Sequence, residues 1–272
     1  MGHPKKYFVK LAVAAAYLLV GCDVALAADH SNWNRFRLTL GTFKPSIDST
    51  VRLDTSAFLA GTNLDLEDDL GLEDSDNLFS IEAMWRLTKR FSLEASYFEL
   101  GRSGSSTLTQ TISFGDQTFG LNADIDSKMT TDIASLAVQY SFWHSEKLDI
   151  AASLGAYLMK IEASIDSTTP IAVTESVDAN VPLPLMGLRL EYFFTPKLSM
   201  NLKARYFAVE ISDVDGSMNN FLVGLQYNVF EHLGIGVGYE HFGVDVTSQN
   251  VDFPGAFEFQ YDGPKLFVSA QF

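Results

Sequence analysis

The chain has 272 residues, of which 47% are hydrophobic and 19% are charged, and its formal net charge is −15. This acidic balance excludes a nucleic-acid-binding protein that depends on clustered Lys and Arg, because phosphate contacts need such clusters. The single cysteine, Cys22, excludes an internal disulfide framework, and 21 Phe, 10 Tyr and 3 Trp argue against disorder.

Residues 1–27 have the pattern of a secretory signal peptide. The segment begins with the positive charges of Lys5, Lys6 and Lys10. An uncharged, mostly apolar run follows over residues 11–22, and it is shorter than the roughly 20 residues that a membrane-spanning helix needs. Ala25-Leu26-Ala27 matches a signal-peptidase site. We therefore expect cleavage after Ala27 and a single folded domain over residues 28–272.

A second interpretation of the same segment is a lipoprotein signal. Leu19-Val20-Gly21-Cys22 resembles the lipobox of bacterial lipoproteins, in which the cysteine is acylated and becomes the mature N-terminus. A lipidated Cys22 would tether the chain to a membrane without spanning it. Ordinary cleavage is the favoured interpretation, because the box is short and the Ala-Leu-Ala site downstream is good.

The rest of the chain alternates between apolar and polar residues, as strands with two different faces do. In residues 198–208 the even positions are apolar, and the odd positions up to Arg205 are polar. In chain order, the expected strands cover residues 35–40, 79–87, 91–97, 134–142, 148–158, 186–192, 198–208, 221–229, 233–239 and 266–272.

The alternation is compatible with two folds, a soluble β-sandwich in water and a β-barrel in a membrane. In a soluble sandwich the apolar face is the core, whereas in a membrane barrel it faces lipid and the polar face lines the interior. Strands of about 9–11 residues, the length of a tilted crossing, favour the barrel. So do polar faces rich in Gly and Ser, and aromatic residues at strand ends. The longest uncharged stretch after residue 28 is only residues 216–230, so no second helical span is expected.

Short and long connections alternate along the chain. The short ones are residues 88–90, 143–147, 195–197 and 230–232, and the long ones are residues 48–77, 102–129, 164–181, 212–217 and 246–256. Outer-membrane barrels have this arrangement. Four short turns and two termini on the same side predict a closed, all-β, antiparallel up-and-down barrel of about ten strands. A barrel of eight or twelve strands remains an alternative, since residues 51–66 or residues 165–178 could form a further pair of strands. Within 102–129, the residues flanking Gly115-Asp116-Gln117 predict a hairpin that extends beyond the membrane.

The last strand carries the most specific resemblance. Its even positions from Leu266 to the final Phe272 are apolar, which resembles the terminal strand read by the outer-membrane barrel insertion machinery. Phe257, Phe259 and Tyr261 have the opposite parity, so a bulge near Gly263-Pro264 is expected.

Over about residues 33–272 the chain resembles bacterial outer-membrane β-barrel proteins. The segment Leu64–Leu72, followed by a hairpin, resembles a group of poorly characterised barrels from Gram-negative bacteria. The resemblance implies extracellular long loops, periplasmic termini, and outer-membrane lipid, lipopolysaccharide and the insertion machinery as partners. It implies no cofactor and no nucleic-acid partner.

Charged residues on the polar faces are the first candidate site. The charges expected inside the barrel are Arg35, Arg37, Glu82, Arg86, Glu94, Arg189, Glu191, Lys203, Arg205, Glu240 and Glu258. Such groups must pair in a narrow barrel, because an unpaired charge away from water is unfavourable. A ten-stranded barrel is only slightly wider than eight-stranded ones that side chains fill. We therefore expect a salt-bridged interior in a structural or surface-interaction protein, with a narrow porin-like channel for small solutes as the alternative.

Two further candidates are weaker. Clustered carboxylates at Asp65, Glu67, Asp68 and Asp69 suit a divalent cation, but Leu70 stands where a calcium loop needs glycine, so no metal site is expected and the loop is expected to be solvated. A surface protease or lipid A-modifying enzyme would need a histidine at the outer rim, and only His241 lies near the outer end of a strand. No catalytic residue is assigned.

Overall fold

The computed structural model describes residues 34–53, 63–75, 78–114, 117–169, 173–211, 214–248 and 255–272. The expected signal segment, including Cys22, lies outside these ranges. Among the described residues, no helix has the length and apolar character required to cross a membrane.

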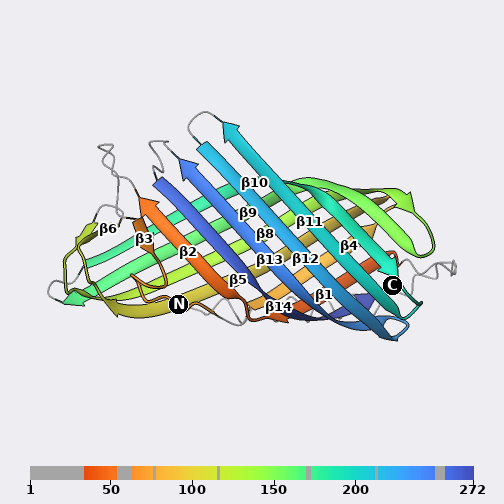
Figure 1. The fold of residues 1–272 in the computed structure, drawn as a ribbon, viewed down its shortest axis with the longest axis horizontal. Helices are drawn as coiled ribbons and strands as arrows, with labels where there is room; N and C mark the ends of the chain where they lie inside the picture. Colours follow the sequence, from red (N-terminus) through yellow and green to blue (C-terminus); the bar gives the residue numbers. More distant parts are fainter. Residues whose placement is uncertain are drawn as a thin grey trace. The chain divides into compact units, whose positions relative to one another are not determined.

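Ten long strands close into an antiparallel barrel, in agreement with the predicted fold (Figure 1). The wall strands are β1 (Phe36–Phe43), continued by β2 (Ser46–Leu53), β4 (Leu78–Arg86), β5 (Phe91–Thr107), β8 (Asp124–His144), β9 (Leu148–Thr169), β10 (Val173–Phe193), β11 (Leu198–Ile211), β12 (Val214–Phe230), β13 (Leu233–Ser248) and β14 (Gly255–Gln271). Each pairs with the next, and β1 closes the ring on β14. β1 and β2 act as one interrupted strand, because both pair with β14 in a single register.

The side chains of the wall confirm the predicted orientation of the two faces. Leu136, Leu154 and Tyr206 point outward and are 61%, 65% and 63% exposed. Their polar neighbours Gln139 and Ser153 point inward and are buried. The apolar faces therefore do not form a core, as they would in a soluble sandwich, and instead make a band around the outside.

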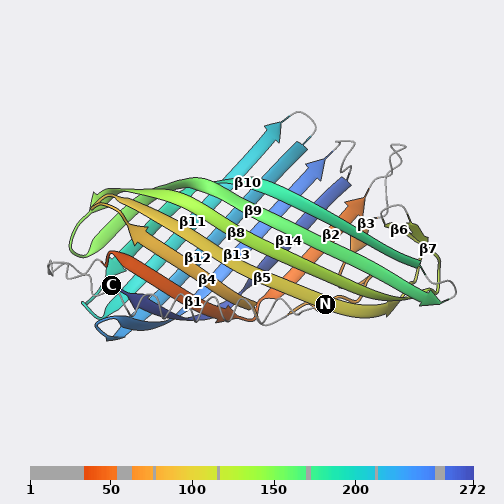
Figure 2. The ribbon, with the colours of Figure 1, turned by 180° about the vertical axis from the view of Figure 1, so that it is seen from behind.

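The barrel has two different ends. The turn end carries the four short connections and the residues that begin β1 and end β14. The loop end carries the remaining connections, although only residues 170–172 separate β9 from β10 and only residues 212–213 separate β11 from β12. Several segments expected to be loops are mainly strand, because β8, β9 and β10 are 21, 22 and 21 residues long (Figure 2). The predicted hairpin within residues 102–129 is present as β6 (Ile112–Phe114) paired with β7 (Gln117–Phe119).

The strand extensions were not recognised because the two faces exchange polarity toward the loop end. On β9, Ile161 and Ile165 point inward and are buried, while Glu162 is exposed on the outside. The same exchange explains an error in β14. No bulge occurs near Gly263-Pro264, since β14 pairs with β13 in one continuous register from residue 255 to residue 270. Phe257, Phe259 and Tyr261 are therefore interior residues.

Residues 63–75, which we call the inserted segment, fold into the loop half of the barrel. The short β3 (Asn63–Asp65) pairs with β2, and Leu64, Leu66, Leu70 and Leu72 are 1–5% exposed. The prediction of a solvated outer loop is therefore wrong for these leucines, whereas the carboxylates of Asp68, Glu73 and Asp74 are exposed. Burial of four leucines supplies the driving force for insertion.

Two glycines allow the inserted segment to dock on β5. Gly71 has a φ of 69°, and Leu72 forms an isolated bridge with Gly104. A Cβ atom added to Gly104 would lie 1.8 Å from the carbonyl oxygen of Gly71, so only glycine permits this backbone contact.

We expect Gly104→Ala to displace the inserted segment and to lower the free energy of unfolding by about 1–3 kcal/mol, the usual effect of overpacking. Urea unfolding in detergent micelles measures the change. Gly101→Ala on the same strand is the matched control, because an added Cβ there meets no atom within 4 Å. Equal stability of the two variants would contradict the docking contact.

Candidate functional site: the interior of the barrel

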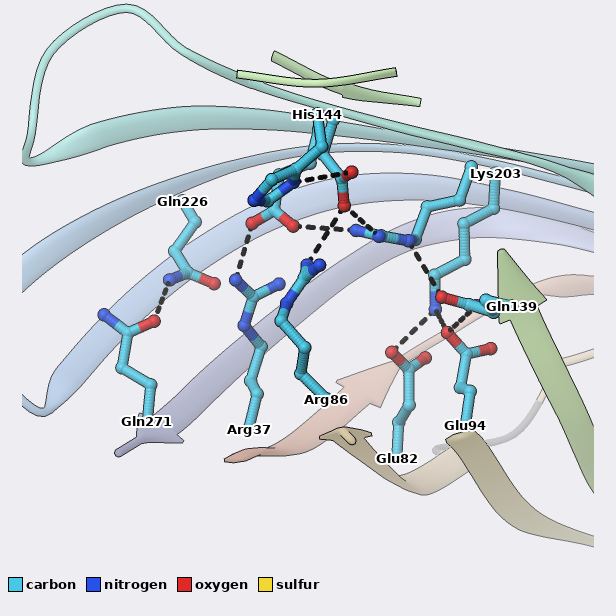
Figure 3. A network of polar contacts seen from close by, with 12 residues as sticks. Arg37, Glu82, Arg86, Glu94, Gln139, His144, Lys203, Gln226 and Gln271 are labelled. Atoms are coloured by element: carbon cyan, nitrogen blue, oxygen red, sulfur yellow. Dashed lines mark hydrogen bonds and ion pairs between the residues drawn. The ribbon is translucent and has the colours of Figure 1, made fainter. Parts of the chain in front are cut away.

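The interior of the turn half is a continuous network of ion pairs. Arg189 lies at its centre and pairs with both Asp149 and Glu191, with 2.9 Å between its Nη1 and Oε2 of Glu191. Arg37 approaches Glu191 to 2.5 Å, and Arg86 approaches Asp149 to 3.0 Å. These residues come from strands on opposite sides of the barrel, so their side chains span the interior (Figure 3).

A second group is centred on Glu94, which is 1% exposed. Lys203 and Arg205 both pair with Glu94, and Lys203 also pairs with Glu82 at 2.6 Å. Gln139 joins the two groups, because it donates to Glu94 at 2.9 Å and accepts a hydrogen bond from Arg189 at 2.9 Å (Figure 3). The two groups therefore form one network across the interior.

A third group marks the boundary with the loop half. Glu240 pairs with Lys265 at 2.8 Å and accepts hydrogen bonds from Asn220 and Tyr261. Arg205 donates to the hydroxyl of Tyr157 at 2.8 Å. The rings of Tyr157 and Tyr261 belong to the apolar cluster that begins here, so each tyrosine joins the charged layer to the apolar one.

The charges of this half balance almost completely. The basic members are Arg37, Arg86, Arg189, Lys203, Arg205 and Lys265, and the acidic members are Glu82, Glu94, Asp149, Glu191 and Glu240. Each has an ion-pair partner. The cavities that remain among them measure only about 50 and 40 Å³. Each of these two cavities has room for only a few waters. A larger space of about 830 Å³, lined mostly by apolar side chains, shares Gln226 and Phe267 with the first.

The loop half is filled by apolar side chains instead. Arg102 is the exception, and it pairs with Glu67 of the inserted segment and donates to Ser49 at 2.7 Å. Ser49 in turn donates to Glu67 from both its hydroxyl and its backbone nitrogen. This buried cluster ties the inserted segment to β2 and β5. Beside it lies an apolar cavity of about 50 Å³ lined by Leu66, Leu70, Leu72, Met129, Ile165 and Phe257, among others.

The structure places nine of the eleven expected interior charges inside the barrel and two outside. Arg35 is exposed at the turn end. Glu258 is exposed on the outer face, because the polarity of β14 is exchanged there. Asp149 and Lys265 are interior charges that the sequence analysis did not single out, although both lie on polar faces of alternating strands.

The acidic segment uses its carboxylates for other contacts. Asp65 accepts hydrogen bonds from the backbone nitrogens of Glu67 and Asp68, at 3.1 and 2.8 Å, and Asp69 accepts one from the backbone nitrogen of Asp65. Glu67 pairs with Arg102. Within the described ranges, no group of three or more His, Cys, Asp and Glu side chains is placed to hold a metal ion.

Phe272 closes the ring at the turn end. Its carbonyl oxygen accepts hydrogen bonds from the backbone nitrogens of Arg35 and Phe36, and its ring stacks on His232 with 5.4 Å between centroids. The other described histidines lie apart from it. His144 contacts Asp149 at 3.1 Å, and His241 lies opposite Asp262 in the ladder of β13 and β14.

The comparisons with known proteins agree with this architecture. The family model described as "Outer membrane protein beta-barrel domain" matches residues 13–228. No curated protein matches the chain. The outer membrane protease OmpT from Escherichia coli has a TM-score of 0.58 at 9% identity, covering 87% of this chain and 96% of its own. Ail, the attachment invasion locus protein of Yersinia pestis, has a TM-score of 0.35 at 12% identity, with coverages of 86% and 99%. The P. putida toluene transporter TodX has a TM-score of 0.35 at 9% identity, with coverages of 90% and 91%.

We expect Glu94→Gln to lower the free energy of unfolding by about 3–5 kcal/mol, because the change leaves Lys203 and Arg205 buried without their shared counter-charge. Urea unfolding in detergent micelles measures the loss. Glu99→Gln is the matched control, since Glu99 is exposed on the outer face of the same strand and should change stability by no more than about 0.5 kcal/mol. If both variants lose the same small amount, the network does not stabilise the barrel.

Proposed function

The chain belongs to the outer membrane protein β-barrel domain family, and on this premise we propose that it is a non-conducting barrel of structural or surface-interaction type. The closed interior is the observation that carries this proposal. In the turn half, the two cavities lined in part by the eleven paired charges measure only about 50 and 40 Å³. In the loop half, the inserted segment and the apolar cluster fill the remaining space.

The alternative is a narrow porin-like channel for small solutes. A conducting pore needs a continuous polar path in which an ion binds weakly enough to leave again. The network of paired charges supports the non-conducting role, because opening it would separate ions whose partners lie at 2.5–3.0 Å. Removing one partner of a buried ion pair strongly lowers the stability of the folded protein, because the other charge is left uncompensated.

In this proposal the turn end faces the periplasm and the loop end faces the cell exterior. The short connections at one end and the strand extensions at the other support this orientation, which is the usual one for outer-membrane barrels. Outer-membrane lipid and lipopolysaccharide then surround the apolar band. The aromatic C-terminal Phe272 serves as the insertion signal, and the exposed carboxylates Asp68, Glu73 and Asp74 of the acidic loop would gather divalent cations loosely.

Planar-bilayer recording tests the non-conducting role. Purified protein inserted into a bilayer at 0.1–1 M salt, with salt and voltage as the only variables, should give no stable single-channel steps. A general porin recorded in the same bilayer verifies that conductance would be seen. Stable steps whose size changes in Arg205→Ala or Glu191→Ala would overturn the proposal in favour of a channel through the charged interior.

We also propose that the chain is not a protease or a lipid A-modifying enzyme. His241 lies on the outer wall opposite Asp262, and Asp262 already accepts a hydrogen bond from Tyr239. The expected result is no hydrolysis of peptides or lipid A by wild-type protein in lipopolysaccharide-containing micelles. Hydrolysis by the wild type that His241→Ala abolishes would show instead that this histidine acts as a base.

A further inference from the structure

The wall of the barrel is not paired along its full height between β10 and β11. Their ladder runs only from Gly187 opposite Arg205 to Phe193 opposite Ser199. On their other sides, β10 pairs with β9 up to residue 173, and β11 pairs with β12 up to residue 211. We call the unpaired stretches, residues 173–186 of β10 and 206–211 of β11, the β10/β11 split. Both views show the two strands diverging toward the loop end (Figures 1 and 2).

Two prolines account for the end of the ladder. Continued in the same register, it would place Pro184 opposite Ala208 and Pro182 opposite Glu210. Proline has no backbone N–H to donate, so it weakens any ladder that needs a donor at its position. Pro182 and Pro184 already pair with β9, and their lack of an N–H disfavours a second ladder with β11 on the other side.

The split joins two apolar environments. At its lower end, Met186 and Tyr206 point outward and are 50% and 63% exposed, in continuity with the outer apolar band. On the inner side, Leu183 and Leu185 are buried in the same apolar cluster that lines the cavity under the inserted segment. Phe207 of β11 is only partly buried at this point. The outer apolar band and the interior apolar cluster therefore approach each other at the lower end of the split. The cavity itself is lined by other members of the cluster and by the inserted segment.

The axial routes to this interior are closed. The network of paired charges blocks the turn half, because an apolar molecule cannot replace the ion-pair contacts it would break. The inserted segment fills the loop half from above, held by Arg102 and Glu67. Within the described part of the chain, the split is one place where the wall has no ladder beside the apolar interior. The loop-end part of β5 is another, and the inserted segment covers it through the bridge between Leu72 and Gly104.

We propose that the loop half of the interior is a binding chamber for a small apolar molecule, which enters sideways from the hydrocarbon of the outer leaflet through the β10/β11 split. The cavity of about 50 Å³ is the starting point. An apolar cavity of roughly 150 Å³ accepts benzene. Entry of a ring of that size therefore displaces one or more leucines of the inserted segment, which line the cavity. The proposal is independent of conductance, since a non-conducting barrel can still bind a ligand from the membrane.

Methionine methyl groups report on binding at the chamber. Met129, Met159 and Met218 belong to the apolar cluster, whereas Met84 is buried in the charged turn half and serves as the internal control. In ¹³C-methyl-methionine NMR of the full barrel in micelles, fluorobenzene should shift the three chamber resonances with saturation and leave that of Met84 unchanged. No saturable shift of the three chamber resonances would overturn the chamber.

A reducible cross-link across the split tests the route. Pro184→Cys combined with Ala208→Cys places two thiols at its facing edges, joined directly or by a bis-methanethiosulfonate bridge. Bridging should slow the appearance of the chamber shifts after mixing at least tenfold, and reduction should restore the rate. The control pair, Leu188→Cys with Ala204→Cys, bridges two residues that are already opposite each other in the ladder and should have no effect. Equal rates in the bridged and reduced forms of the first pair would overturn the lateral route.

Discussion

The width of a ten-stranded wall is the constraint on which the rest of the structure depends. Its interior is narrow enough for side chains to fill, and whatever fills it must be satisfied without bulk water. In the turn half the filling is charged, so it has to pair, and Arg189 and Glu94 each hold two partners of opposite charge. In the loop half the filling is apolar and needs no partners. The interior is therefore closed in both halves, by ion pairs in the turn half and by apolar packing in the loop half.

The exchange of polarity along the strands has a single cause. Where the outside meets hydrocarbon, the outer face must be apolar, and the inside receives the polar residues. Beyond the membrane the outside meets water, so the outer face becomes polar and the inside becomes an ordinary core. One strand shows both regimes, since β9 carries exposed Leu154 outside and buried Ser153 inside near the turn end, but exposed Glu162 outside and buried Ile165 inside near the loop end.

This exchange of polarity explains why the membrane-spanning parts of the strands could be predicted from the sequence and their loop-end extensions could not. Period-two alternation with apolar residues outward identified all ten strands and nine interior charges, because hydrocarbon imposes one rule on every strand within the membrane. The extensions of β8 to β10 and the orientation of Phe257 follow the opposite rule. On β14 the change of parity is visible in the sequence, but alternation alone does not distinguish an exchange of faces from a bulge. The position of the inserted segment was not predicted, because its carboxylates indicated a solvent-exposed loop. Burial of Leu64 and Leu70 holds the segment inside the barrel, and Arg102 on β5 neutralises the charge of Glu67.

The ion-paired filling of the turn half and the apolar filling of the loop half respond differently to deformation. Separating a buried ion pair removes both a Coulombic contact and hydrogen bonds, and removal of one partner costs about 3–5 kcal/mol, so the turn half is rigid. Apolar packing is non-directional, and a leucine displaced by another apolar group of similar volume loses little. The wall reflects this division, because its ladder between β10 and β11 is complete beside the ion pairs and stops at Arg205, where the apolar filling begins. A barrel built in this way closes its axis with ion pairs, and it leaves its wall without a ladder only beside filling that is apolar and easier to rearrange.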